Sequence, residues 1–537
     1  MRLTRISISN HSRLADLELE VRDHLILVGP NDVGKSSLLR CLELLLGATT
    51  AQLYQRILPE DFRELDQPLV LVADLAGFDS DDEALFPDEI TVDPANAESS
   101  LRVRLVATLE GAETLSIQRS APGGGTGRQL SREQVAGLGW KMLGALAHSR
   151  DLRDDRKSPL DDILQAIDLG TEQADFEELT AQLQEKLANS GVLSTLRGDL
   201  AQQLSKALPD EITKDDLVFT PGAAAEQDVL SDVRLHVTKN GSQRRLSEQS
   251  DGTRALYAIA FYDLVSAGSN MVAIDEPETH LHPTSQRSLA RLLREGPNQK
   301  LIATHSADIV GEFEPECVVS VKPGGAVVQP AVGFLSDAEK MSVEWWVRDR
   351  LEPLTARRVI AVEGVSDRIL LQRIADLTGR NLDRLGVSVV ETGGSGNMGA
   401  IIKLFGKTGF DVALSILIDK DAVSFTATKL GAPEIDLAKH SVWVSNPDLE
   451  TEYVSGLGAA ALWTALSASQ RFSPNELNNC GVSGIGGART TDDVAQFCGW
   501  SKYKVRAAMV VAGLVDSTTA KTITSVNNLL GEIAPPA

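Results

Sequence analysis

A glycine-rich segment near the N-terminus constrains the fold more than any other feature of the chain. Residues 29–36, GPNDVGKS, fit the pattern G-x-x-x-x-G-K-[ST]; the apolar run HLILV precedes them and a helix-like stretch, KSSLLRCLELLLG, overlaps their end. Glycines let backbone N–H groups approach phosphates, and a helix N-terminus favours their negative charge. The segment therefore predicts an α/β domain with a phosphate-binding loop between a strand and a helix.

The residue types in this loop predict separate tasks at a bound nucleotide. Lys35 would reach the β- and γ-phosphates, and the hydroxyl of Ser36 would bind Mg²⁺. We also assign three neighbours to nucleotide binding: Asn31, Gly34 and Ser37. The expected cofactors are ATP and Mg²⁺ or Mn²⁺.

Two later strand-like segments end in polar residues that suit the same site. The apolar run MVAI is followed by Asp275 and Glu276, and LIAT is followed by His305. Ligands of α/β domains bind at the carboxyl ends of strands. Asp275 would hold Mg²⁺ through water, Glu276 would act as the catalytic residue that orients or deprotonates the attacking water, and His305 would sense the γ-phosphate. An ordinary capped strand and a structural histidine are the competing interpretations.

A second set of acidic residues follows further strand-like segments. Glu363 ends the run VIAV and Asp367 lies one helical turn later; Asp419 and Asp421 follow LSILI, and Glu450 follows SVWVSN. Converging carboxylates repel one another unless divalent cations hold them. Oxygen-ligated Mg²⁺ or Mn²⁺ suits phosphodiester hydrolysis with two metal ions. The chain is acidic throughout, so solvated loops are the alternative for the Asp-x-Asp pair.

The overall charge bears on the partner. The chain has 52 Lys and Arg and 75 Asp and Glu residues, for a formal charge of −23. Non-specific nucleic-acid binding is driven by basic residues, so bulk charge argues against it. A confined basic strip and metal-mediated phosphate contact stay compatible with this composition. We therefore predict that DNA binding depends on divalent metal.

Several absences suggest the compartment. Four widely spaced cysteines form no CxxC pair, no apolar run reaches about 18 residues, and the N-terminus is polar and alternating. These features predict a cytoplasmic protein without a disulfide framework or a membrane segment.

The nucleotide motifs resemble those of ATP-binding-cassette ATPases, and more narrowly the SMC-like and recombination-repair branch. Residues 246–254, LSEQSDGTR, stand where that family has its LSGGQ signature, with Ser250 and Gly252 as the nearest equivalents. In the family this segment contacts the γ-phosphate bound to the opposite protomer, so the resemblance implies a homodimer or a larger homo-oligomer. Gln55 and Asp61 are both open as candidates for the family's glutamine loop.

The acidic motifs resemble a TOPRIM domain, whose glycine turn is matched by Glu391–Met398. An ATP-binding cassette followed by TOPRIM is similar to the OLD (overcoming lysogenization defect) family, and the Gabija nuclease subunit is built in the same way. The resemblance implies an ATP-regulated, metal-dependent DNA endonuclease in phage defence or DNA repair. A helicase-like partner protein is left open. In this interpretation Glu363, Asp419 and Asp421 are catalytic.

The family also uses a lysine beyond the acidic motifs, and Lys504 is our match. It would stabilise charge on the scissile phosphate. Two alternatives stay open at this point: a helix-turn-helix with Lys502, Lys504 and Arg506 touching the DNA backbone, or solvated helix charges.

The predicted fold class is α/β: an ABC-type P-loop ATPase with a helical insert, then a TOPRIM α/β domain and a helical C-terminal region. The predicted boundaries are 1–134 and 209–335 for the ATPase, 135–208 for a helical dimerisation insert, 336–456 for TOPRIM and 457–537 for the C-terminal helices. The functional alternatives are a DNA-repair ATPase with a non-catalytic TOPRIM unit and, as a remote one, a transporter-type ATPase subunit.

Overall fold

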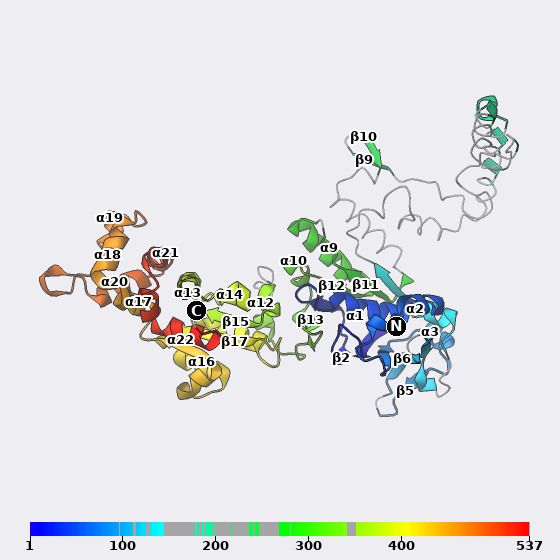
Figure 1. Ribbon diagram of the computed structural model, residues 1–537, viewed down its shortest axis with the longest axis horizontal. Helices are drawn as coiled ribbons and strands as arrows, with labels where there is room; N and C mark the ends of the chain where they lie inside the picture. The colour runs from blue at the N-terminus through cyan, green and yellow to red at the C-terminus, as the bar shows by residue number, and fades with distance from the viewer. Residues whose placement is uncertain are drawn as a thin grey trace.

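The computed structural model describes residues 1–143 apart from 96, 111–113 and 125–128, then 268–340 apart from 280, and 351–535. It also describes short pieces between 175 and 245. Two lobes follow one another along the molecule's long axis (Figure 1). Most of the predicted insert, and the signature segment with Ser250 and Gly252, lie outside the described residues.

An antiparallel sheet forms one part of the N-terminal lobe. Its order is β2 (Leu17–Glu20), β1 (Arg2–Ser9), β4 (Leu69–Ala76), β6 (Ser99–Glu110) and β5 (Ile90–Val92), with β7 (Thr114–Ser120) also pairing with β6. Buried and half-buried residues alternate strictly along β4. Since successive side chains point to opposite faces of a strand, one face of this sheet packs on the core.

A mostly parallel sheet forms the other part of this lobe and carries the nucleotide motifs. Its order is β14 (Val327–Val328), β13 (Val318–Val321), β3 (Leu25–Val28), β12 (Gln299–Ala303), β11 (Met271–Asp275) and β8 (Trp140–Leu143); only β14 is antiparallel. Every residue of β3 and β12 is buried, as expected for strands covered on both faces. Strand β8 lies beyond position 135, so this sheet includes residues that the predicted boundary assigned to the insert.

The second lobe contains a four-stranded parallel sheet in the order β16 (Val387–Glu391), β15 (Arg358–Val362), β17 (Ala413–Asp419) and β18 (Val442–Ser445). Helix α13 (Val365–Leu377) follows β15 and α15 (Met398–Phe405) follows β16. The three strands predicted for this unit are confirmed. All four strands run in one direction, so their carboxyl ends share one edge of the sheet.

Helices complete this lobe, as predicted. The chain continues from β18 through α17 (Leu449–Leu457), α18 (Ala459–Ala468), α20 (Thr491–Gly499), α21 (Lys504–Leu514) and α22 (Thr524–Ile533). Helix α21 packs on α13, and α22 packs on β18. One apolar core joins residues of the sheet, such as Ile360, to residues of the helices, such as Phe497 and Val511. The C-terminal helices therefore belong to the same lobe as the sheet.

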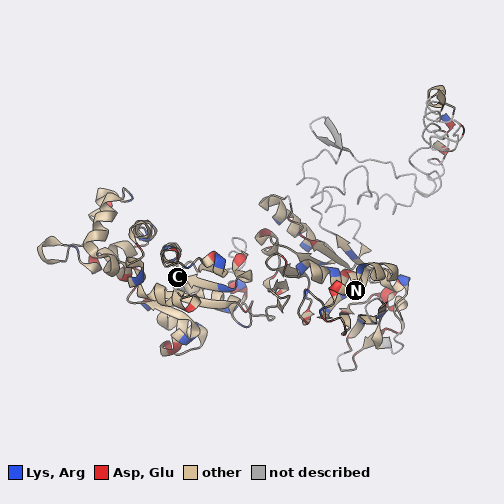
Figure 2. Cartoon of the chain, viewed as in Figure 1, with Lys and Arg blue, Asp and Glu red and all other residues tan. Residues whose placement is uncertain are grey.

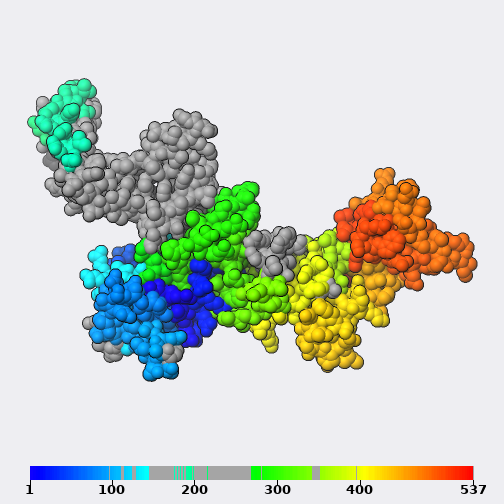
Figure 3. Space-filling view, turned by 180° about the vertical axis from the view of Figure 1, so that it is seen from behind, coloured from blue at the N-terminus to red at the C-terminus, as the bar shows by residue number. Residues whose placement is uncertain are grey.

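The two lobes meet through a continuous apolar core. Phe334, Leu335 and Leu354 belong to the core cluster that also contains strand residues of both parallel sheets. The backbone N–H of Ala331 donates to the carbonyl of Thr408 at 2.8 Å. Figure 3 shows the N-terminal lobe in blue and green and the second lobe in yellow to red. No helix among the described residues is long and apolar enough to span a membrane.

Candidate active sites

The phosphate-binding loop has the predicted geometry. Gly34 precedes α1 (Lys35–Leu42) with φ at 110°, where other residues are strained. A Cβ on Gly34 would lie 2.7 Å from Leu14 Cδ2, so the position needs glycine for space as well. Lys35 is buried and donates to the carbonyls of Gly29 (3.0 Å) and Pro30 (2.9 Å). Its ammonium thus lies within the loop, at the place where a phosphate would bind.

The three predicted strand ends converge on this lysine. The Nε2 atom of His305 is 2.8 Å from Lys35 Nζ and 3.8 Å from a carboxylate oxygen of Glu276. Burial first and Lys35 second lower the pKa of His305, so the neutral ring can accept from the ammonium. Burial also lowers the pKa of Lys35, which Glu276 and Asp275 oppose.

Asp275 and Ser36 offer oxygen ligands of the kind that Mg²⁺ prefers. The Ser36 hydroxyl donates to the Asp275 carboxylate, and burial raises the pKa of that carboxyl. Its Oδ1 atom is buried without a hydrogen-bond partner among the described residues. An unsatisfied buried oxygen beside a hydroxyl fits a cation that would hold both.

Glu276 has a backbone conformation that is rare for a residue with a side chain. Its φ is 48°, in the left-handed region. Its N–H donates to the carbonyl of Ala303 at 2.9 Å, which holds it in place. Such strain tends to occur at functional sites, where the surrounding structure over-determines it.

The other residues predicted to bind the nucleotide differ in their exposure to solvent. Asn31 is exposed in the loop, and Ser37 is half-buried in the first turn of α1. Of the two glutamine-loop candidates, Gln55 is exposed on α2 (Thr50–Arg56). Asp61 is buried and forms an ion pair with Arg40 at 3.1 Å. Asp61 therefore has a structural partner in Arg40.

The second acidic site gathers at the carboxyl edge of the four-stranded parallel sheet. Lys504, at the start of α21, places Nζ 3.8 Å from Asp367 Oδ1, 3.8 Å from Asp419 Oδ2 and 3.5 Å from Glu450 Oε1. Glu363 joins them because its Oε1 accepts from the backbone N–H of Asp419 at 3.3 Å. We call these five residues the carboxylate–lysine cluster.

Local hydrogen bonds position the members of this cluster. Asp367 accepts from the N–H of Gly364 at 2.9 Å, which fixes it at the first turn of α13. Asp419 Oδ1 accepts from the N–H of Leu449 at 3.0 Å, which ties the end of β17 to the start of α17. Glu450 then lies on the first turn of α17, 3% exposed.

Burial dominates the electrostatics of the cluster. It raises the pKa of Asp419 to about 7 and that of Glu450 to about 7, against the opposing effect of Lys504. It also raises the pKa of Glu363. For Lys504, burial lowers the pKa, but Asp367, Glu450, Asp419 and Glu363 outweigh it and the pKa is raised. The lysine is thus a charged counter-ion among acids that hold their protons unusually well.

Three further acidic residues lie near the cluster in the chain: the candidate Asp421, and Asp448 and Glu452, which flank Glu450. Asp421 is exposed on the turn after β17, and its charge raises the pKa of Glu363. Asp448 caps α17 by accepting from the N–H of Thr451 at 2.7 Å. Glu452 accepts from the hydroxyl of Ser525 at 2.8 Å and so joins α17 to α22. Asp448 and Glu452 are therefore structural.

The donor set of the cluster fits hard divalent cations because every ligand is a carboxylate oxygen. In the described part of the chain, no three or more His, Cys, Asp or Glu side chains lie close enough together to hold a metal ion. The ammonium of Lys504 lies among these carboxylates instead. Glu363, Asp367, Asp419 and Glu450 could hold the cations, with Asp421 at the edge.

The segment considered as a helix-turn-helix has the helices α20 and α21, but α21 is not free to enter a groove. Ala507, Ala508 and Val511 are buried, and the helix packs on α13. Arg506 pairs with Glu476 at 2.8 Å. Lys502 is exposed, with Nζ 4.6 Å from the Tyr503 ring. Lys502 is accordingly the most exposed of the three basic residues.

Comparisons with known proteins agree with this arrangement. A family model described as "AAA domain, putative AbiEii toxin, Type IV TA system" matches residues 25–311, more than half of the chain. A second, described as "Overcoming lysogenization defect protein-like, TOPRIM domain", matches residues 354–421. The chain therefore belongs to the family of the first model, and its later part is similar to OLD-like TOPRIM domains. It joins an ATPase domain to a TOPRIM nuclease domain.

Two curated OLD-type relatives cover most of the chain. The OLD nuclease of Thermus scotoductus is 25% identical over 459 residues, 78% of this chain and 82% of that protein. Endonuclease GajA of Bacillus cereus is 20% identical over 432 residues, 74% of this chain and 71% of that protein. The solved C-terminal region of the Burkholderia pseudomallei OLD protein, 21% identical, covers 33% of this chain and 99% of its own length, with a TM-score of 0.27.

Sequence reasoning missed Glu278. Its two carboxylate oxygens accept from the backbone N–H of His305 at 2.5 Å and from the hydroxyl of Thr304 at 2.8 Å. The only signal in the sequence is its position three residues after Asp275. Contacts between loops that are distant in the chain leave no periodic pattern in the sequence. The contact of Glu278 with the loop of His305 is therefore visible only in the structure.

Proposed function

We propose that this chain is an OLD-type DNA endonuclease that needs Mg²⁺ or Mn²⁺ and is regulated by ATP binding and hydrolysis, in phage defence or DNA repair. The observation that carries the proposal is the carboxylate–lysine cluster. Four acids, from the loop after β15, the end of β17 and the first turns of α13 and α17, gather with one ammonium at the carboxyl edge of the sheet. A purely structural site would not need to gather four carboxylates.

The cluster supports a division of labour in phosphodiester hydrolysis. Bound Mg²⁺ or Mn²⁺ would activate the attacking water and stabilise the leaving 3′-oxygen. Glu363, Asp367, Asp419 and Glu450 would hold the cations. Lys504 would give up its carboxylate partners and place its charge against the scissile phosphate. Lys502, two residues earlier and exposed, would meet the flanking backbone.

The nucleotide site supports hydrolysis of ATP. Lys35 would exchange its loop carbonyls and His305 for the β- and γ-phosphates. Asp275 and Ser36 would hold Mg²⁺, and Glu276 would orient the attacking water. His305 would contact the γ-phosphate. The family resemblance proposes a homodimer in which Ser250 or Gly252 of one protomer completes the site of the other.

A plasmid-nicking assay tests this function. Wild type and an Asp419→Ala/Asp421→Ala variant are incubated with Mg²⁺ or Mn²⁺, with and without ATP. We expect wild type to nick and the double variant to lose nicking while its ATP hydrolysis is retained. Unchanged nicking in the double variant would reject the nuclease assignment. Absence of nicking in both proteins, with ATP hydrolysis intact, would favour a DNA-repair ATPase whose TOPRIM unit only binds DNA or a partner.

A further inference from the structure

We propose that Glu278 is a positioning residue that holds His305 in place for the ATPase reaction. This proposal rests on the proposed ATP hydrolysis. Glu278 lies in the loop between β11 and α9 (Pro283–Glu295), and His305 lies in the loop after β12. The Glu278 carboxylate connects these two loops by hydrogen bonds.

Both oxygens of that carboxylate are used. Oε1 accepts from the His305 N–H at 2.5 Å and Oε2 from the Thr304 hydroxyl at 2.8 Å. Burial raises the pKa of Glu278, and these hydrogen bonds oppose the rise. With both oxygens engaged, the Glu278 carboxylate ties its own loop to the loop that carries His305. Its contribution is to fix a backbone.

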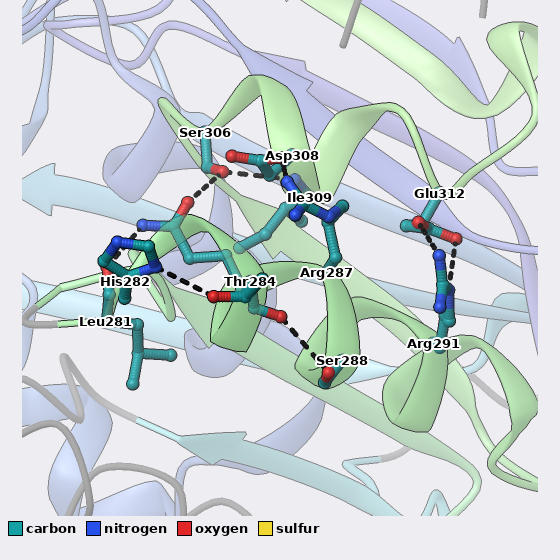
Figure 4. A network of polar contacts seen from close by, with 11 residues as sticks. Leu281, His282, Thr284, Arg287, Ser288, Arg291, Ser306, Asp308, Ile309 and Glu312 are labelled. Carbon is teal, nitrogen blue, oxygen red and sulfur yellow. Dashed lines mark hydrogen bonds and ion pairs between the residues drawn. The ribbon is translucent and has the colours of Figure 1, made fainter.

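The contact belongs to a closed ring of hydrogen bonds. The Thr304 hydroxyl also accepts from the Ser306 N–H at 2.9 Å, and the Ser306 hydroxyl donates to Gln286 Oε1 at 2.5 Å. Gln286 Nε2 donates to the carbonyl of Leu281 at 2.8 Å and to that of Glu278 at 3.5 Å. Figure 4 shows Ser306 bonded across to α9. The ring returns to Glu278 and so joins both loops to α9.

Holding this backbone matters because the His305 ring has few other constraints. The His305 residue is exposed, and within the described part of the chain its ring contacts Lys35 Nζ at 2.8 Å and Glu276 at 3.8 Å. The far side of the loop is fixed as well, since the Thr304 N–H donates to the carbonyl of Leu27 at 3.0 Å. Without Glu278, the His305 N–H would lose its acceptor. The ring would then no longer be held next to Lys35. A misplacement of about 1 Å can cost a hundredfold in rate.

A double-mutant cycle tests the proposal. ATP hydrolysis is measured for wild type, Glu278→Ala, His305→Ala and the double variant of the full chain. We expect Glu278→Ala to lower kcat by about tenfold or more, with a smaller change in KM. In the His305→Ala background, the same substitution should change kcat by less than about twofold, because residues that act as a unit are non-additive. Full additivity of the two losses would overturn the proposal.

Two further variants keep the test interpretable. Thr304→Val removes one donor to Glu278 but leaves the His305 N–H bond, so its kcat should lie between wild type and Glu278→Ala. Ser288→Ala is the matched control on α9, since the Ser288 hydroxyl donates to the carbonyl of Thr284 at 3.1 Å and lies outside the ring. It should behave as wild type. Equal losses in Ser288→Ala and Glu278→Ala would indicate general damage to α9 and overturn the positioning role.

A binding readout separates this proposal from the proposed function. The same four proteins are titrated with ATPγS by calorimetry. If wild type binds nucleotide without hydrolysing it, the hydrolysis assignment fails, and coupling between Glu278 and His305 in the affinities would still support the positioning role. Additive affinities in that case would reject the positioning role too.

Discussion

Lys504 carries one positive charge among four acidic residues. Its side chain is 24% exposed and that of Glu450 is 4% exposed, so water screens the charges only partly. Removing one partner from such a site leaves the others uncompensated. In the metal-free protein, Lys504 therefore compensates part of the negative charge that divalent cations would compensate in the active enzyme.

The first prediction concerns this role. Lys504→Met should lower the stability of the protein in EDTA at pH 8 by about 3 kcal/mol, because buried carboxylates lose their counter-ion. Added Mn²⁺ should restore the melting temperature. Lys504→Arg retains the charge and serves as the control. The idea fails if Lys504→Met melts with wild type in EDTA.

The second prediction concerns pH. Asp419 and Glu450 titrate near 7 in the folded state and near 4 when unfolded, so the folded state binds more protons between these values. Their stabilising contribution is complete below about pH 4 and is lost as the pH rises through about 7. Metal-free wild type should therefore lose more stability from pH 5 to pH 8 than Asp419→Asn does. Denaturant unfolding at each pH measures this, and parallel pH profiles would contradict it.

The same titration governs metal affinity. Cations compete with protons for these carboxylates, so Mn²⁺ should bind more tightly as the pH rises through about 7. Electron paramagnetic resonance of free Mn²⁺ measures the affinity.

At the scale of elements, the end of the phosphate-loop helix depends on a strand of the other sheet. Helix α1 continues into a π-helical turn, Glu43–Gly47. Arg119 of β7 is buried and donates to the carbonyl of Ala48 at 2.6 Å and to those of Leu44 and Leu45 at 3.4 Å. Burial lowers the pKa of Arg119 to about 10. This guanidinium satisfies carbonyls that a helix end leaves unpaired.

The third prediction follows from that contact. Arg119→Met should destabilise the protein by about 2–3 kcal/mol, because buried carbonyls lose their donor. Arg104→Met is the control, since Arg104 is exposed on the neighbouring β6. Thermal unfolding of both variants decides the matter, and equal melting temperatures would refute the capping role.

Elements also show what sequence can predict. The strands before Gly29, Asp275, His305, Glu363 and Asp419 were predictable because apolar runs ended by polar residues are a local signal. Lys504 was reachable only through the family resemblance, and the structure places it at the cluster. Glu278 and Arg119 were missed because their partners lie 27 and about 70 residues away and leave no periodic trace. The β8 strand was assigned to the insert because four residues are too short a pattern to separate from the helix-like sequence after it.

At the scale of the whole molecule, positively and negatively charged residues are interspersed, not separated onto different lobes. Figure 2 shows Lys and Arg interspersed with Asp and Glu over both lobes. The net charge of −23 repels DNA at a distance. Local contacts must overcome this repulsion, and the best placed described groups are the cation ligands and Lys502.

The fourth prediction is therefore that DNA binding is weak without divalent metal at physiological salt. Fluorescence anisotropy with a labelled duplex should show affinity rising at least tenfold when Ca²⁺, a non-catalytic cation, replaces EDTA. In Glu450→Gln the gain should shrink. Tight binding in EDTA would contradict the prediction.

The most direct test of the central claim is the rate of plasmid nicking by Glu450→Gln in Mn²⁺ under single-turnover conditions. Glutamine keeps the shape of a side chain that is 4% exposed and removes its negative charge. The exposed Glu434 of the same lobe provides the control, Glu434→Gln. The carboxylate–lysine cluster predicts a loss of about a hundredfold or more for Glu450→Gln, wild-type nicking for the control, and unchanged ATP hydrolysis in both. Equal nicking by the two variants would show that the cluster is not the nuclease centre.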